Sequence, residues 1–119
     1  MGQPAFALHT DRVHWTVEDV RAVILANPVV IFCRGSQVHP RCGFSERVIA
    51  DFTKIGAAFE VVDVSGQASI KAALREFTGE KSLPLAFVNG QLIGGFEEIE
   101  RLSESGELSE LVNSLVSNS

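Results

Sequence analysis

The sequence predicts a single α/β domain with a four-stranded mixed sheet flanked by helices. Three observations lead to this prediction. A continuously apolar, β-rich run over 29–32 lies between two amphipathic helical patterns. A hairpin signal spans 85–93, with Asn89-Gly90 at the turn, where positive φ is needed. At 119 residues and 45% hydrophobic composition, the chain can build one core without disulfide staples.

The first half of the chain alternates helix and strand. Thr16 and Asp19 have the spacing of a capping box that opens a helix, and Pro28 ends it. The apolar run then predicts a strand buried on both faces. A second helix follows over 44–56, and a second strand over 59–64. The apolar side chains at helical spacing are Val17, Val20, Ile24 and Leu25 in the first helix, and Phe44, Val48, Phe52 and Ile55 in the second.

The second half contains the hairpin between helices. A short helix begins near Ile70 and ends near Gly79, and the hairpin follows. A helical pattern then runs from Glu97 to the C-terminus, and Gly106 divides it in two. The resulting order is α-β-α-β-α-β-β-α-α. A βαβ half followed by a ββα half is the thioredoxin-like arrangement.

Charge and cysteine content narrow the possible functions. The net charge of -5 gives no reason to expect nucleic acid or an anionic membrane as a partner. No apolar run approaches the roughly 20 residues of a membrane span. Two cysteines, Cys33 and Cys42, do not make a disulfide scaffold, so a reducing compartment is expected. Residues 1–15 lack the pattern of a secretory signal and are interpreted as a tail.

Cys42 is the candidate reactive residue. It follows a polar loop and directly precedes a helical pattern, so the unpaired N–H groups of a first helical turn would favour its thiolate. Arg34 and Arg41 add positive charge nearby. Ser45 stands where a dithiol motif has its second cysteine, so a local two-cysteine cycle is unavailable. The thiolate could exchange with a disulfide or ligate a soft metal centre.

These features resemble the monothiol glutaredoxins of the CGFS type. The resemblance covers residues 16–116, which gives a glutaredoxin domain between tails at 1–15 and 117–119. The loop between Gly35 and Cys42 has the extended length of that class. The matching segments are Cys42-Gly43-Phe44-Ser45, Phe32-Cys33-Arg34-Gly35, Ser82-Leu83-Pro84, Gly94-Gly95-Phe96-Glu97 and Ser105-Gly106-Glu107-Leu108.

The resemblance implies an iron–sulfur carrier. A [2Fe–2S] cluster needs four ligands, usually thiolates, and one exposed cysteine cannot supply them. Two chains would supply them as a homodimer, each giving Cys42 and one bound glutathione thiol, and would pass the cluster to acceptor apo iron–sulfur proteins. The alternatives are a glutathione-dependent thiol–disulfide oxidoreductase that uses Cys42 alone to remove glutathione from protein thiols, and a degenerate thioredoxin-like interaction module. Relatives of this size imply the mitochondrial matrix, with the cytoplasm as the alternative.

The resemblance also implies a glutathione pocket with basic residues at one end. Arg34 and Lys71 match the family's residues that bind the glycyl carboxylate. Leu83 would pair its backbone with the cysteinyl part, and a cis Pro84 would expose that backbone. A solvated helix charge is the alternative for Lys71, and an ordinary strand-start proline for Pro84.

At the other end of this pocket, Gly95, Phe96 and Glu97 would bind the γ-glutamyl group through a helix N-terminus and a carboxylate. A plain turn followed by a first-turn acid is the alternative. The chain departs from the family pattern beside this pocket, at Arg34 for Lys, Glu80-Lys81 for Trp-Pro, Leu85 for Gln and Glu97 for Asp.

Two further residues are interpreted as structural. Cys33 ends the buried strand, which favours a small core residue; the alternative is a resolving thiol that closes a disulfide with Cys42 on oxidation. His39 lies beside Pro40, and a surface loop residue is favoured over a metal ligand. No Cys/His pair has zinc-site spacing.

Overall fold

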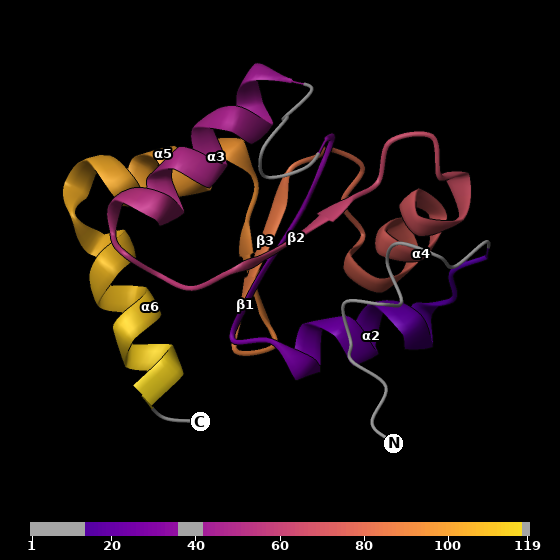
Figure 1. Cartoon of the computed structure of the whole chain (residues 1–119), viewed down its shortest axis with the longest axis horizontal. Coiled ribbons are helices and arrows are strands. Elements are labelled where there is room, and N and C mark those ends of the chain that lie inside the picture. The colour runs from indigo at the N-terminus through magenta and orange to yellow at the C-terminus, as the bar shows by residue number, and fades with distance from the viewer. Residues whose placement is uncertain (1–13, 36–41, 118–119) are drawn as a thin grey trace.

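The computed structural model describes residues 14–35 and 42–117. Figure 1 shows strands at the centre of the molecule and helices on either side. The elements, in chain order, are α2 (Val17–Ala26), β1 (Val29–Cys33), α3 (Gly43–Lys54), β2 (Glu60–Asp63), α4 (Ala68–Thr78), β3 (Leu85–Val88), β4 (Gln91–Gly94), α5 (Phe96–Ser105) and α6 (Glu107–Ser117).

The four strands form one mixed sheet in the order β2-β1-β3-β4. β1 pairs parallel with β2 and antiparallel with β3, and β3 pairs antiparallel with β4. Phe32 near the end of β1 is therefore opposite Val62 on one side and Leu85 on the other. The predicted thioredoxin-like fold with a four-stranded mixed sheet is confirmed.

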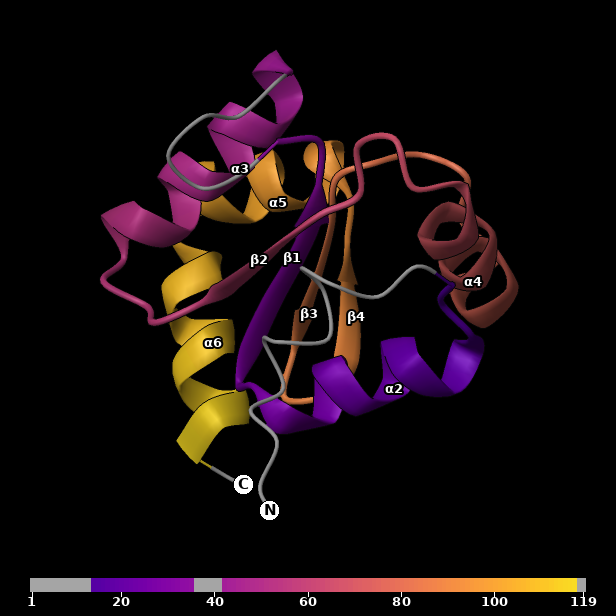
Figure 2. The same cartoon turned by 45° about the vertical axis from the view of Figure 1, so that its right-hand side comes forward.

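Helices cover both faces of the sheet. α2 and α4 pack together on one face, and α3, α5 and α6 lie on the other (Figures 1 and 2). All five residues of β1 are buried, as predicted for a strand covered on both sides. Val30 and Phe32 belong to the core under α2 and α4, whereas Ile31 and Cys33 belong to the core under the other three helices. Cys33 thus points to the side on which α3 carries Cys42.

Local sequence signals act where they were expected. The Thr16–Asp19 capping box is present at the start of α2. Asn89 and Gly90 have φ of 51° and 81°, which is the positive-φ pair that a tight hairpin requires. Gly106, with φ of 84°, separates α5 from α6.

Three apolar residues differ from the prediction. Leu25 is 70% exposed and Phe44 57% exposed, although both were assigned to buried helix faces. Val23 takes the place in the α2 core that was expected for Leu25. Trp15, assigned to the tail, is 2% exposed and packs in the core under α2 and α4, and its backbone N–H donates to Ser69 Oγ at 2.9 Å.

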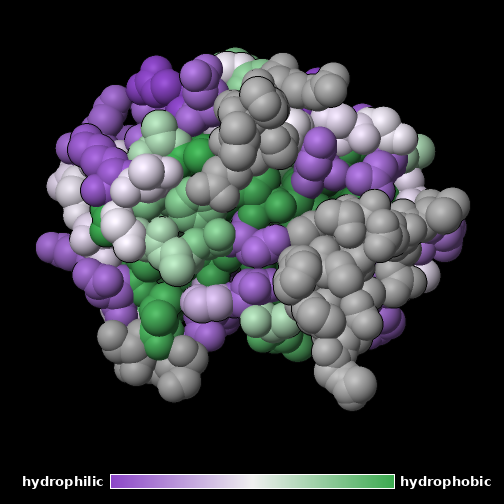
Figure 3. Space-filling model, viewed as in Figure 1, coloured by the Kyte–Doolittle hydropathy of each residue, from purple (hydrophilic) through white to green (hydrophobic). Residues whose placement is uncertain are grey.

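The face shown in Figure 3 has polar and apolar regions. In Figure 3, hydrophilic side chains occupy the upper left rim over α3 and α5, and hydrophobic side chains are visible toward the middle of the same face. Within the described residues, no helix combines the length and apolar character that crossing a bilayer requires.

A carboxyl pair joins α3 to α5, the two helices whose N-termini approach the site described below. Asp51 and Glu100 are close enough to share a hydrogen bond, which, with burial, raises the pKa of Glu100. Arg47 pairs with Glu100 Oε1 at 2.8 Å, and the Ser103 hydroxyl donates to Asp51 Oδ1 at 3.1 Å. The Glu100 side chain is 13% exposed. A pKa that is higher in the folded than in the unfolded protein stabilises the fold at low pH. The stabilisation is complete below the pKa that Glu100 has in the unfolded chain, and it is lost as the pH rises through the pKa in the folded protein.

We therefore expect Asp51→Asn to stabilise the protein at neutral pH. The amide removes one of two neighbouring charges and offers a donor to Glu100, a gain of about 1 kcal/mol in unfolding free energy. At pH 4, Glu100 is protonated because its pKa is raised above the ordinary 4.5, so the gain should be smaller there. Urea unfolding at the two pH values measures it. Glu104→Gln, an exposed neutralisation on α5, is the control; equal stabilisation by both variants would contradict the expectation.

Candidate functional site

Cys42 is the N-cap residue of α3, with extended backbone at φ −147° and ψ 149°. Its Sγ accepts the backbone N–H of Ser45 at 3.3 Å and lies 3.2 Å from Ser45 Oγ. Partial burial opposes ionisation of the thiol. The hydrogen bonds from the Ser45 hydroxyl and from the backbone of Ser45 and Phe44, together with the Arg34 charge, outweigh burial and lower the pKa of Cys42 below its ordinary value of 9.0.

Ser45 joins the thiol to the sheet. The residue is completely buried, and its Oγ accepts the backbone N–H of Arg34 at 3.3 Å. The sequence indicated only that Ser45 was not a second cysteine; its contact with Arg34 was missed. One signal in the sequence did place Ser45 near the thiol. Ser45 is three residues after the N-cap Cys42, and at that position the backbone N–H commonly donates to the side chain of the N-cap residue.

Ser45→Ala is expected to raise the pKa of Cys42, because the variant removes a hydroxyl donor to the thiolate. A hydrogen bond to a charged group contributes roughly 1.5 kcal/mol or more, so the iodoacetamide alkylation rate of Cys42 near neutral pH should fall about tenfold. Rates measured across pH give the shift. Ser82→Ala, at an exposed serine of the same pocket, is the control and should leave the pH profile in place. An unchanged profile for the Ser45 variant would refute this role.

Asp63, the last residue of β2, holds the chain at the end of β1. Gly35, with φ of 94°, donates its N–H to Asp63 Oδ1 at 2.9 Å, and Ser65 donates to the same oxygen at 2.8 Å. Two hydrogen bonds therefore hold the backbone at Arg34: its own N–H donates to Ser45 Oγ, and the N–H of the following residue donates to Asp63 Oδ1. The Arg34 side chain is exposed beside the thiol.

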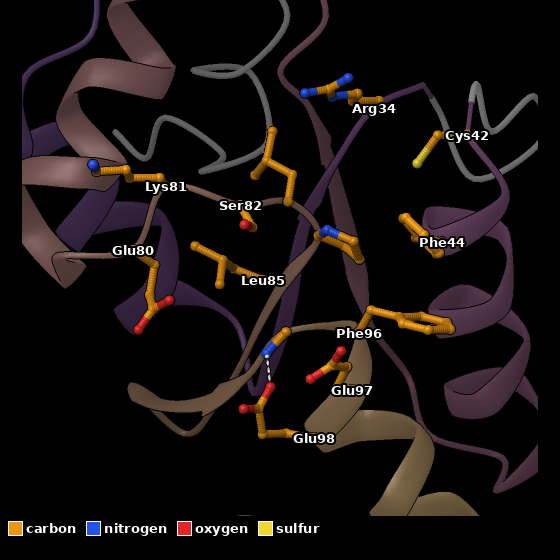
Figure 4. Close-up of a pocket in the computed structure, with 13 residues that line it drawn as sticks. Arg34, Cys42, Phe44, Glu80, Lys81, Ser82, Leu85, Phe96, Glu97 and Glu98 are labelled. Carbon is orange, nitrogen blue, oxygen red and sulfur yellow. Dashed lines mark hydrogen bonds between the residues drawn. The ribbon is translucent and has the colours of Figure 1, made fainter.

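A pocket of about 680 Å³ opens at Cys42. Cys42 and Phe44 lie on one side, and Glu80 and Lys81 lie on the far side (Figure 4). Six of the seven residues predicted to bind glutathione line this pocket with Cys42. They are Arg34, Leu83, Pro84, Gly95, Phe96 and Glu97.

Lys71, the seventh, lines an adjoining cavity of about 180 Å³ instead. Arg34 and Leu83 line both cavities, so the two lie side by side.

The pocket wall opposite the thiol is built from the segment before β3 and from the start of α5. The Leu83–Pro84 peptide bond is cis, as the resemblance implied. Gly95 is the N-cap of α5, and its N–H donates to Glu98 Oε1 at 3.0 Å, the bond drawn in Figure 4. The Phe96 ring lies 4.6 Å from the ring of Phe44, so the starts of α3 and α5 are in contact at the pocket. Glu97 is exposed.

Comparison with known proteins agrees with this geometry. The family model described as Glutaredoxin matches residues 29–93, which include both β1 and the hairpin. The chain belongs to the glutaredoxin family. A monothiol glutaredoxin from Synechocystis, ycf64-like, is 33% identical over 90 residues, which are 76% of this chain and 84% of that one. Glutaredoxin 4 of Escherichia coli is 30% identical over 97 residues, 82% of this chain and 84% of that one. With Ser45 as its third residue after Cys42, the chain falls among the monothiol glutaredoxins.

Solved glutaredoxin structures share the fold. A buckwheat glutaredoxin–glutathione complex superimposes with a TM-score of 0.73 at 25% identity, covering 83% of this chain and 88% of that one.

The second cysteine of this monothiol glutaredoxin lies in the core. Cys33 is completely buried, and its Sγ contacts the Gly35 carbonyl at 3.4 Å. Burial raises the pKa of Cys33 to about 12, and the negative charge of Asp63 acts in the same direction. This placement matches the interpretation as a small core residue, and both cysteines are free. His39 and Arg41 lie outside the described residues.

Proposed function

We propose that this glutaredoxin carries a [2Fe–2S] cluster between two chains, with glutathione as co-ligand, and delivers it to acceptor apo iron–sulfur proteins. The observation that carries the proposal is the pairing of one accessible, low-pKa thiol, Cys42, with Ser45 where a second thiol would stand. A thiolate that lacks a local partner can serve as a ligand without being lost to an internal disulfide.

Ligand counting supports a shared site. Within residues 14–35 and 42–117, no three His, Cys, Asp or Glu side chains group as metal ligands, and Cys33 is buried with a raised pKa. The chain thus offers one thiolate to a cluster that takes four ligands. Two copies of Cys42 and two glutathione thiols make up that number.

The pocket supports glutathione as the co-ligand. Its volume of about 680 Å³ is in the range of small-molecule sites. Arg34 and Lys71 would bind the glycyl carboxylate, the backbone of Leu83 the cysteinyl part, and the start of α5 at Gly95 the γ-glutamyl carboxylate. The related buckwheat protein was solved as a glutathione complex.

The residues around Cys42 would allow the [2Fe–2S] cluster to pass to an acceptor protein. The Ser45 hydroxyl and Arg34 hold Cys42 as a thiolate, the form that binds soft metals. Half of the ligand set would come from a small molecule that dissociates. An acceptor's thiolates can then replace the glutathione and Cys42 sulfurs one at a time, with no change in oxidation state.

Anaerobic reconstitution tests this function. With iron, sulfide and glutathione, the wild-type protein should give a coloured dimer that contains about one glutathione per chain, read by absorption and size-exclusion chromatography. Cys42→Ser should lose the colour completely. Cys33→Ala is the matched control, because it removes the other thiol and should keep the colour. A coloured Cys42→Ser protein would refute the proposal.

Glutathione-dependent removal of glutathione from protein thiols, with Cys42 alone as the reacting thiol, is the second candidate, favoured by the same lowered pKa of Cys42. The Cys42 thiolate would attack the glutathione sulfur of a mixed disulfide and release the protein thiolate. A second glutathione thiolate would then reduce the Cys42–glutathione disulfide and leave as glutathione disulfide. Two results together would favour this function over the first. The protein would turn over a glutathionylated peptide at an enzyme-like rate, and it would fail to form the coloured dimer.

A further inference from the structure

Positive charge is concentrated beside the thiol pocket although the chain as a whole is acidic. Of the ten Lys and Arg residues, four line the cavity of about 180 Å³: Arg34, Lys71, Arg75 and Lys81. Glu80 is the acidic residue in this lining. The local balance is therefore four positive charges against one negative, in a chain whose net charge is -5.

These four basic side chains have no ionic partner within the described part of the chain. All four residues are exposed, and the ion pairs found there belong to Arg21 and Arg47 instead. A group of four like charges with a single counter-charge, Glu80, opposes folding through mutual repulsion, which a bound anionic partner would relieve.

The cavity adjoins the thiol pocket. Arg34, Lys81 and Leu83 line both spaces, and the smaller cavity continues the basic lining to Lys71 and Arg75 on α4. In Figure 4, Lys81 lies across the pocket from Cys42. Glutathione would place one carboxylate between Arg34 and Lys71. Arg75 and Lys81 then have no assigned ligand group.

We propose that Arg75 and Lys81 dock an acidic polypeptide segment of the partner protein, next to the cysteine that exchanges with Cys42. The smaller cavity fits a side chain rather than a large ligand, given its volume of about 180 Å³. The partner must carry a thiol or disulfide, because that is what Cys42 reacts with, and carboxylates a few residues away would reach the two cations. The proposal rests on the proposed function only in taking Cys42 as the reacting thiol.

Docking of this kind acts mainly on the association rate. Complementary charge raises encounter rates by roughly 10-fold to 1000-fold and is suppressed by salt. Proteins that present acidic residues beside a reactive cysteine would thus be preferred over neutral or basic ones.

Peptide mixed disulfides test the proposal without glutathione or iron. Three peptides of equal length, acidic, neutral and basic around one cysteine, each carry a nitrothiobenzoate group. The Cys42 thiolate attacks the peptide sulfur, a Cys42–peptide disulfide forms, and the coloured nitrothiobenzoate thiolate leaves with the electron pair. We expect the acidic peptide to react about tenfold faster than the neutral one at low salt, and this ratio to approach one near 1 M salt, where the screening length is about 3 Å.

Two double variants distinguish the effect of charges in the cavity from the effect of the net charge of the protein. Arg75→Gln with Lys81→Gln should reduce the acidic-to-neutral ratio to about two or less. Lys54→Gln with Arg101→Gln changes the net charge equally at exposed sites outside the cavity, and should keep the ratio. Equal loss in both double variants, or no preference in the wild type, would overturn the proposal. So would competition by inorganic phosphate beyond that of chloride at equal ionic strength, since a small anion would then be the ligand. Failure of cluster assembly would leave these rates unaffected.

Discussion

At about pH 8, Cys42 is expected to react with iodoacetamide at least about 1000 times faster than Cys33. A thiol with a pKa of about 12 is ionised to roughly one part in 10,000 at that pH, and a thiol with the ordinary value of 9.0 to roughly one part in ten. The lowered pKa of Cys42 increases the difference, and the complete burial of Cys33 increases it further. Mass spectrometry of the two cysteine-containing peptides over time gives both rates from one sample.

Unfolding provides the control for this difference. In concentrated urea the two thiols lose their separate environments and should react at similar rates. Comparable rates in the folded protein would contradict both the burial of Cys33 and the activation of Cys42. The experiment needs no substitution, so it cannot fail through misfolding of a variant.

Gly94→Ala is expected to destabilise the protein by about 3 kcal/mol or more. Gly94 has φ of 145°, which side-chain-bearing residues rarely adopt, and an added Cβ would lie 2.7 Å from Glu98 Cβ and 2.9 Å from Glu98 Cγ. Backbone strain contributes about 1–3 kcal/mol and overpacking a similar amount. Because Gly94 connects β4 to the start of α5, the pocket wall at Gly95 should shift as well.

Gly66→Ala isolates the backbone contribution. Gly66 also has positive φ, 69°, but an added Cβ would meet no atom within 4 Å. This variant should lose only about 1 kcal/mol. Urea unfolding of both proteins gives the difference, and equal destabilisation would show that the contact with Glu98 has no effect.

The sequence predicted best the features that depend on neighbouring residues. The Thr16–Asp19 capping box and the Asn89-Gly90 turn each lie within four residues, so their geometry is readable locally. Helical periodicity gave the positions of the helices but not which apolar residues are covered. Leu25 stays exposed at the surface of α2, and Phe44 lies beside Phe96 at the pocket with more than half of its surface exposed. Which apolar residues are covered depends on packing between elements, which has no local signal in the sequence.

The site, too, has features that neighbouring residues predicted and features that depend on contacts between distant parts of the chain. The position of Cys42 before a helix indicated its reactivity, and the residues around cis Pro84 and Gly95 were found through the resemblance. The anchor of Gly35 on Asp63 spans 28 residues, and nothing in the intervening sequence indicates it. Lys71 lines the adjoining cavity because α4 packs against α2, which again is a tertiary effect.

The meeting of two helix starts at one pocket affects how this site can evolve. α3 begins beside Cys42 and α5 begins at Gly95, so the partial positive charges of both helix N-termini lie at the same pocket. Main-chain donors persist whatever side chains are substituted around them. A binding surface that draws on backbone geometry can therefore tolerate substitution at Glu80, Lys81 and Leu85, and its rim can change toward new partners while the two helix N-termini keep their place.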